Sequence, residues 1–123
     1  MIEDQITEKI LNSAFKVHTV LGPGLLESAY EECLFYECRK SGLYVEKQKP
    51  MPLIYEDVKL EIGYRVDLLV EGKVVVEIKS IDAFNNIHMA QVLTYLKLSG
   101  CRIGLLLNFN VKRLKDGIKR VIL

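Results

Sequence analysis

The spacing of apolar side chains predicts two helices at the start of the chain. From Asp4 to Leu21, apolar residues recur every three or four positions, which is the period of one helix face. The segment Gly22-Pro23-Gly24 ends this helix, because proline cannot donate the next backbone hydrogen bond. A second helix is expected from about Leu25 to Lys40, with Ser41-Gly42 as its stop. Its expected buried positions are Leu26, Tyr30, Cys33, Leu34 and Cys38.

After Gly42 the pattern changes to short segments rich in Val, Ile, Tyr and Leu, separated by turn residues, which is typical of strands. Pro50 and Pro52 place their segment at a sheet edge or a bend, because proline cannot donate to a central ladder. The turn at Glu71-Gly72 indicates that the strands on either side of it form a hairpin. We expect strands near residues 43–48, 52–56, 58–62, 64–70 and 73–80.

A parallel crossover is predicted in the last third of the chain. Asn85 or Asn86 can cap a helix over residues 86–99. Residues 102–108 form a nearly continuous apolar run, which is typical of a strand buried on both faces, and residues 118–123 are a candidate edge strand. A strand, a helix and a second strand of these lengths suit a parallel connection. The apolar positions expected on the helix are Ile87, Met89, Ala90, Val92, Leu93 and Leu96.

Composition narrows the class of protein. With 123 residues, half of them hydrophobic, one domain is expected. Charged residues interrupt every apolar segment, and the first residues carry acidic groups instead of a basic region followed by an apolar run. We therefore expect no membrane span, no signal peptide and a cytoplasmic location. The three cysteines match no zinc-binding spacing, and are expected to be buried or half-buried thiols.

The charge is unevenly distributed, although the net formal charge is only +1. Residues 1–96 hold ten Lys or Arg against fifteen Asp or Glu, whereas residues 97–123 hold seven against one, so these parts carry −5 and +6. Such a basic region suggests a surface that faces a polyanion, and a solvated face is the alternative. Its candidate phosphate contacts are Lys112, Arg113, Lys115, Lys119 and Arg120.

The candidate chemistry lies on the predicted hairpin. Residues two apart on a strand share a face, so Glu77 and Lys79 point the same way. Asp67 lies within the preceding apolar strand, where a carboxylate is costly to bury unless it is paired or binds a cation. If the hairpin pairs across Glu71-Gly72, Asp67 falls roughly opposite Val76 and Glu77. The two carboxylates are therefore expected to converge.

Two carboxylates, the backbone carbonyl of Ile78 and water molecules would suit Mg²⁺ or Mn²⁺. Lys79, next to such an ion, could orient or deprotonate an attacking water, while the metal neutralises charge on a phosphate. This set fits the hydrolysis of phosphodiester bonds. The same spacing also fits a purely structural alternative, a buried ion pair between Lys79 and Asp67 or Glu77.

These motifs, taken in order, resemble the PD-(D/E)XK nuclease superfamily, with Asp67 and Glu77-Ile78-Lys79 as its D…E-x-K signature. Val66-Asp67 stands where the superfamily's name has Pro-Asp. Within the superfamily the chain is most similar to the small bacterial and archaeal G-x-x-E-x-x-Y proteins, whose motif is here Gly24-Leu25-Leu26-Glu27-Ser28-Ala29-Tyr30. The likeness covers nearly the whole chain and continues through Gly63–Asp67, His88–Gln91, Tyr95-Leu96, Gly104–Phe109 and Gly117–Arg120.

The resemblance implies an α/β fold of the restriction-endonuclease-like kind, in which helices flank a central mixed β-sheet. It implies one nuclease-like domain over residues 1–123, with the order αα-β-hairpin-βαβ. It further implies a metal-dependent nuclease in which Asp67 and Glu77 are metal ligands and Lys79 is the catalytic lysine.

Three further residues enter through the same resemblance. Glu27 corresponds to an acidic residue that completes the metal site, and its alternative is a helix-start carboxylate favoured by the helix dipole. Gln91 corresponds to a polar residue on the helix after the E-x-K strand. Tyr95, four residues later, shares its helix face and could contact the phosphate, and core packing is the alternative for Tyr95 and for Tyr30.

Two functions are compatible with these residues. The first is a nuclease that uses Mg²⁺ or Mn²⁺ and acts on nucleic acid, with DNA as the expected substrate. The second is a non-catalytic nucleic-acid or protein interaction module on the same fold, with a homodimer formed through exposed apolar strand surface. The intact Asp67, Glu77 and Lys79 favour the nuclease. A phosphate-binding loop at Gly22-Pro23-Gly24 is excluded, because this segment follows a helix and lacks the Lys-Ser/Thr pair.

Overall fold

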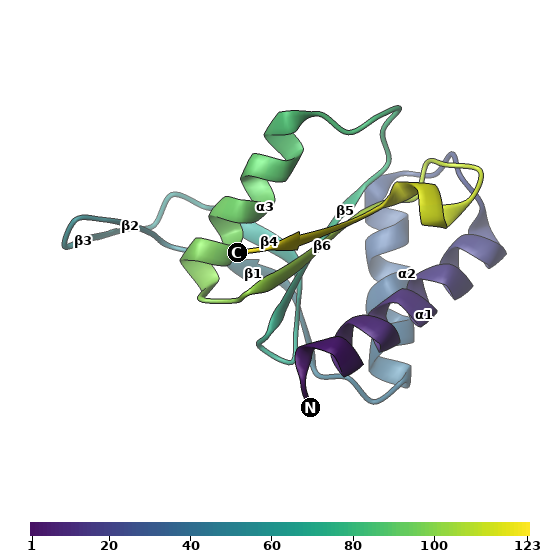
Figure 1. Ribbon diagram of the computed structural model, residues 1–123, viewed down its shortest axis with the longest axis horizontal. Coiled ribbons are helices and arrows are strands. Elements are labelled where there is room, and N and C mark those ends of the chain that lie inside the picture. The colour runs from purple at the N-terminus through teal and green to yellow at the C-terminus, as the bar shows by residue number, and fades with distance from the viewer.

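The computed structural model describes residues 1–123 and shows a mixed β-sheet with helices on both faces (Figure 1). In chain order the elements are α1 (Glu3–Leu21), α2 (Glu27–Lys40), β1 (Val45–Pro50), β2 (Leu53–Tyr55), β3 (Val58–Leu60), β4 (Arg65–Val70), β5 (Val74–Lys79), α3 (Asn86–Ser99), β6 (Ile103–Asn108), the 3₁₀ helix η1 (Leu114–Gly117) and β7 (Ile118–Ile122). The predicted α/β class and the predicted element order are confirmed.

The main sheet has five strands in the order β1-β4-β5-β6-β7. Neighbouring strands are antiparallel except β5 and β6, which are parallel and are joined by α3, as predicted for the crossover. The edge strands are β1 and β7, in agreement with the prolines near β1 and with the predicted last strand. The remaining strands, β2 and β3, form a separate hairpin that projects away from the sheet (Figure 1).

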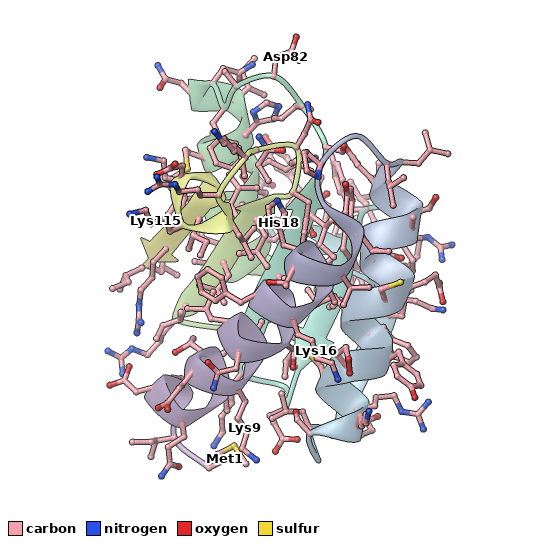
Figure 2. The ribbon with its side chains drawn as sticks, turned by 90° about the vertical axis from the view of Figure 1, so that its right-hand side faces the viewer. Met1, Lys9, Lys16, His18, Asp82 and Lys115 are labelled. Carbon is pink, nitrogen blue, oxygen red and sulfur yellow. The ribbon has the colours of Figure 1, made fainter.

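Each face of the sheet has its own apolar layer. Helices α1 and α2 cover one face, the one nearer the viewer in Figure 2, and α3 covers the other. Along β5, Val74, Val76 and Ile78 belong to the layer under α1 and α2, whereas Val75 belongs to the layer under α3. Because side chains alternate along a strand, Glu77 and Lys79 point to the α3 side.

The predicted burial of the second helix needs correction at its start. Helix α2 begins at Glu27 instead of Leu25, because Leu26 has an extended backbone, with φ −70 and ψ 151. The Leu26 side chain is 77% exposed, so its predicted burial is wrong. Cys33 is half-buried, whereas Tyr30, Leu34 and Cys38 are buried as expected.

The third helix has the predicted cap but a different buried face. The Asn85 side chain accepts hydrogen bonds from the backbone N–H groups of Ile87 (2.9 Å) and His88 (3.2 Å). Ile87 and Ala90, two of the apolar positions expected on this helix, are exposed. The helix is apolar on most of its circumference, so periodicity alone does not select a face. The face packed on the sheet consists of Val92, Tyr95 and Leu96.

All three cysteines are free thiols. Cys33 is half-buried, and Cys38 and Cys101 are buried, as predicted. Burial raises the pKa of the Cys38 thiol to about 11, so this side chain behaves as a small apolar group at neutral pH. None of the three α-helices combines the length and the apolar character that crossing a bilayer requires.

Candidate active site

Strands β4 and β5 pair regularly near their turn and separate at Asp67. The last paired residues are Leu68 and Val76. Beyond them, side chains replace the backbone ladder: the Asp67 N–H donates to Glu77 Oε2 (2.7 Å), and the Ile78 N–H donates to Asp67 Oδ2 (2.8 Å). Each carboxylate is therefore held by the backbone of the opposite strand, and the predicted convergence of Asp67 and Glu77 is confirmed.

In this reciprocal arrangement each carboxylate keeps one oxygen atom that the backbone of the opposite strand does not bind. Asp67 Oδ1 and Glu77 Oε1 are not used in these two backbone hydrogen bonds. In an extended strand the N–H and C=O of one residue point to the same edge, and the Ile78 N–H faces β4. The Ile78 carbonyl therefore faces the same gap as the two carboxylates.

Neither carboxylate forms an ion pair with a basic side chain. Glu77 is only 3% exposed, and this burial, followed by the negative charge of Asp67, raises the pKa of Glu77 to about 8. The charge of Lys79 acts in the opposite direction, yet none of the ion pairs in the structure includes Asp67, Glu77 or Lys79. The structural alternative of a buried ion pair at this position is therefore wrong.

Glu31 on α2 is a third carboxylate near Asp67, and the sequence interpretation missed it. Gln48 Nε2, from β1, donates to Glu31 Oε1 (2.7 Å) and to Asp67 Oδ1 (3.2 Å). Burial, followed by the negative charge of Asp67, raises the pKa of Glu31 to about 7. The signal that could have found Glu31 is its position four residues after Glu27, which places both on one helix face.

Glu27 has a different environment from the carboxylate cluster. Its side chain is exposed in the first turn of α2, and its Oε2 accepts from the Ser80 N–H (3.2 Å). The Ser80 hydroxyl also donates to the Leu25 carbonyl (2.6 Å). Glu27 has no hydrogen bond with Asp67 or with Glu77. Its contacts join the start of α2 to the chain that leaves β5, immediately after Lys79.

Tyr30 is a core residue that shapes the loop between α1 and α2. Its hydroxyl donates to the Gly22 carbonyl (2.6 Å) and accepts from the Leu25 N–H (3.1 Å). Its ring is fully buried and stacks on Phe109, with a centroid distance of 4.6 Å. Core packing, the alternative considered for this tyrosine, is confirmed.

Gln91 and Tyr95 approach the carboxylates from the α3 side. The exposed Gln91 donates through Nε2 to the Tyr95 hydroxyl (3.3 Å). Burial, followed by the negative charges of Glu77 and Asp67, raises the pKa of Tyr95. Its ring is only 5% exposed and packs edge-on against Tyr64, so it cannot stack on a nucleic-acid base. Any substrate contact by Tyr95 is limited to its hydroxyl.

Three of the basic residues lie at the same end of the sheet as Lys79. Strand β6 ends at Asn108, which pairs with Lys79. The exposed Lys112, Arg113 and Lys115 follow on the segment between β6 and β7, here called the basic loop, in which Lys115 belongs to η1. This loop borders a hollow beside the end of α1, where His18 Nε2 lies 2.8 Å from the Val111 carbonyl oxygen. Figure 2 shows Lys115 on this loop and His18 on α1.

The other two basic residues lie on β7 and point in different directions. Lys119 pairs with Leu106, and therefore faces the α3 side of the sheet. Arg120 pairs with Leu105 on the opposite face, and its Nη2 binds Asp4 Oδ1 near the start of α1 (2.8 Å). The structure thus separates Arg120 from the basic loop.

The side chains around the gap fit a hard divalent cation. No three His, Cys, Asp or Glu side chains converge on one ion position. The donors are instead two carboxylates and one backbone carbonyl, and Mg²⁺ is commonly held by one or two carboxylates while it keeps several waters. Because Asp67 and Glu77 form no ion pair, such an ion would supply positive charge that no contacting side chain provides.

Comparison with known proteins agrees with this geometry. The sequence profile of the PD-(D/E)XK nuclease superfamily matches residues 4–121, from the start of α1 to β7. No curated protein and no solved structure matches the chain. The five-stranded mixed sheet flanked by helices is consistent with a restriction-endonuclease-like fold. Since the match includes both strands that carry the carboxylates, and nearly every other residue, the chain belongs to the PD-(D/E)XK nuclease superfamily.

Proposed function

We propose that the protein is a metal-dependent nuclease that hydrolyses phosphodiester bonds, with DNA as its substrate. The observation that carries this proposal is the meeting of Asp67 and Glu77, neither of them in an ion pair, where β4 and β5 separate. Membership of the superfamily supports nuclease chemistry and a nucleic-acid substrate. It also supports a divalent metal, which these nucleases generally use.

In this proposal Asp67, Glu77 and the carbonyl of Ile78 hold Mg²⁺ or Mn²⁺. The bound ion would neutralise the charge that develops on the phosphate during hydrolysis. The chain's own contribution is the fixed orientation of both carboxylates, because each is anchored by a backbone N–H of the opposite strand. We assign Glu27 a supporting role at the end of β5, since its carboxylate binds the Ser80 N–H.

Lys79 is the group that orients or deprotonates the attacking water. Its ammonium belongs to the same face of β5 as Glu77, two residues away, and it is not committed to an ion pair. Its backbone is held in place, because the Phe109 N–H donates to the Lys79 carbonyl (3.0 Å). Gln91 and the Tyr95 hydroxyl, which are hydrogen-bonded to each other on the α3 side, could contact the phosphate.

The basic loop would bind the phosphate backbone of the substrate. Lys112, Arg113 and Lys115 are exposed and lie at the Lys79 end of the sheet, whereas Arg120 is already paired with Asp4. Contacts of this kind supply affinity and orientation without reading sequence. Lys119, on the α3 side, can add a further phosphate contact.

A degradation assay tests this proposal. Single- and double-stranded DNA and RNA should be incubated with the protein in Mg²⁺ or Mn²⁺, with and without chelator. We expect DNA to be degraded only when the metal is present, and Lys79→Ala to lower the activity by about 10²–10⁴-fold. Preferential degradation of RNA would correct the substrate. Absence of cleavage of all four substrates, with either ion, would favour the non-catalytic interaction module.

A further inference from the structure

Gln48 has an unusual backbone for a residue within a strand. Its φ of 53 lies in the left-handed region, which is strained for residues other than glycine. The other non-glycine residues with positive φ, Glu56 and Glu71, lie in turns. Strain of this kind persists only where the surrounding structure compensates for it, and it is concentrated at functional sites.

The strained residue also interrupts the pairing of β1 with β4. Lys47 pairs with Leu68 and Lys49 with Val66, but Gln48 has no partner in the register. On β4, Val66 and Leu68 contact opposite layers of the sheet, although residues two apart normally share a face. Both strands are therefore irregular at the level of Asp67.

The Gln48 side chain uses this irregularity to reach two carboxylates. One amide nitrogen donates to Glu31 Oε1 at 2.7 Å and to Asp67 Oδ1 at 3.2 Å, and an NH₂ group has two hydrogens for these two bonds. Since the Ile78 N–H already binds Asp67 Oδ2, both oxygens of Asp67 are oriented. An amide provides these hydrogen bonds without adding positive charge, so the attraction for a cation is retained.

We propose that Gln48 is a positioning residue of the metal site, which holds Glu31 beside Asp67 by means of its strained backbone. This inference rests on the proposed function, because it takes Asp67 as a metal ligand. Partners that orient a ligand typically contribute about 10–100-fold to metal affinity when they are removed by mutation. Gln48 itself contacts neither the ion nor the substrate.

The strain allows a positioning role to be separated from a structural one. Gln48→Gly removes the carboxamide and also relieves the positive φ, so it should not lower the stability of the metal-free protein. Glu56→Gly is the matched control, because it relieves a φ of 54 in the turn between β2 and β3, away from the carboxylates. A role confined to structure would not move metal affinity in either variant.

The experiment measures Mn²⁺ affinity by calorimetry, together with the thermal midpoint without metal. We expect Gln48→Gly to weaken Mn²⁺ binding about 10–100-fold with an unchanged or higher midpoint. Gln48→Asn should weaken binding in the same way, because asparagine tolerates this backbone but has a shorter side chain. Glu56→Gly should bind Mn²⁺ like the wild type.

A double-mutant cycle with Glu31→Gln identifies the partner. If Gln48 acts through Glu31, the two losses of affinity should be less than additive. Unchanged Mn²⁺ affinity in Gln48→Gly and Gln48→Asn would overturn the positioning role and leave the proposed function intact. Equal weakening in Gln48→Gly and Glu56→Gly would also overturn it. A wild type that binds no Mn²⁺ would contradict the metal site itself, and the positioning role with it.

Discussion

The two ends of the β4–β5 hairpin are built differently from the same two strands. At the turn end, Leu68–Val70 pairs with Val74–Val76 through the backbone, and all six side chains are buried and apolar. At the open end, Asp67 and Glu77 take the place of the ladder and bring two acidic side chains, neither of them in an ion pair, between the strands. The turn end stabilises the fold, whereas the open end lowers stability and carries the oxygen atoms that we propose as metal ligands.

This contrast explains why the candidate site lies where the strands separate. A continuous ladder would use every backbone N–H and C=O of both strands, and would leave no place for carboxylates between them. Once the strands separate, the side chains satisfy the free N–H groups, and each carboxylate keeps one oxygen that no backbone group binds. The following substitutions test whether the two ends differ in this way, from the largest expected effect to the smallest.

The largest effect should come from Lys79→Ala. Loss of the group that orients or deprotonates water typically costs about 10²–10⁴-fold in rate, so cleavage should fall by that factor. The thermal midpoint should change little, because Lys79 forms no ion pair. Lys73→Ala is the control at the turn end, where Lys73 Nζ binds only the Met1 carbonyl. Comparable loss of cleavage in both variants would contradict the difference between the ends.

The opposite result is expected for Val70→Ala at the turn end. Val70 is fully buried, and removing two methyl groups from such a site should lower the free energy of unfolding by about 1–3 kcal/mol. Mn²⁺ affinity, measured by calorimetry on the folded variant, should remain that of the wild type. Weakened Mn²⁺ binding together with an unchanged urea midpoint would mean that the two ends are not separate in function.

The sequence predicts the turn end better than the open end, for a physical reason. Enrichment in Val, Ile, Tyr and Leu and the turn at Glu71-Gly72 are local signals, and they correctly predicted both strands and, through the hairpin, the approach of Asp67 to Glu77. The meeting of Glu31 with Asp67 depends on how α2 packs on the sheet, which no local pattern encodes. The left-handed backbone of Gln48 carries no signal either, since glutamine is not a residue that favours it.

The same limit explains the errors in the helices. Leu26 was expected to be buried because its spacing fits the apolar face of the second helix, but the chain is still extended there. On α3, both Ile87 and Val92 belong to apolar patterns at helical spacing. Only the position of the helix over β6 decides that Val92 is buried and Ile87 exposed.

A smaller effect is expected from Glu77→Gln on the pH dependence of stability. In the metal-free wild type, folded Glu77 keeps its proton up to about pH 8, whereas the unfolded chain releases it near 4.5. The folded state binds more protons between these values, so stability falls as pH rises through this window. The variant should show a shallower fall in urea unfolding with chelator between pH 5 and 9. An identical fall in both proteins would show that Glu77 is not a destabilising buried acid.

The smallest effect should be seen in the salt dependence of nucleic-acid binding. Each phosphate contact contributes about 0.9 to the slope of log affinity against log salt for duplex DNA. Replacing Lys112, Arg113 and Lys115 by Glu should flatten the slope, whereas Arg120→Glu should change it less, because Arg120 is paired with Asp4. Fluorescence anisotropy at several salt concentrations measures both. An unchanged slope in the triple variant would make the basic loop a solvated surface.

The most direct test of the account is a calorimetric titration with Mn²⁺ of the wild type, Asp67→Asn and the control Asp57→Asn. Asparagine keeps an oxygen that accepts from the Ile78 N–H but removes the charge, so the fold should persist while the ion loses a ligand. Asp57 lies in the exposed turn between β2 and β3. We predict one binding event in the wild type and in Asp57→Asn, and affinity at least about tenfold weaker in Asp67→Asn. Equal Mn²⁺ affinity in all three proteins would contradict a metal site at the open end of the hairpin.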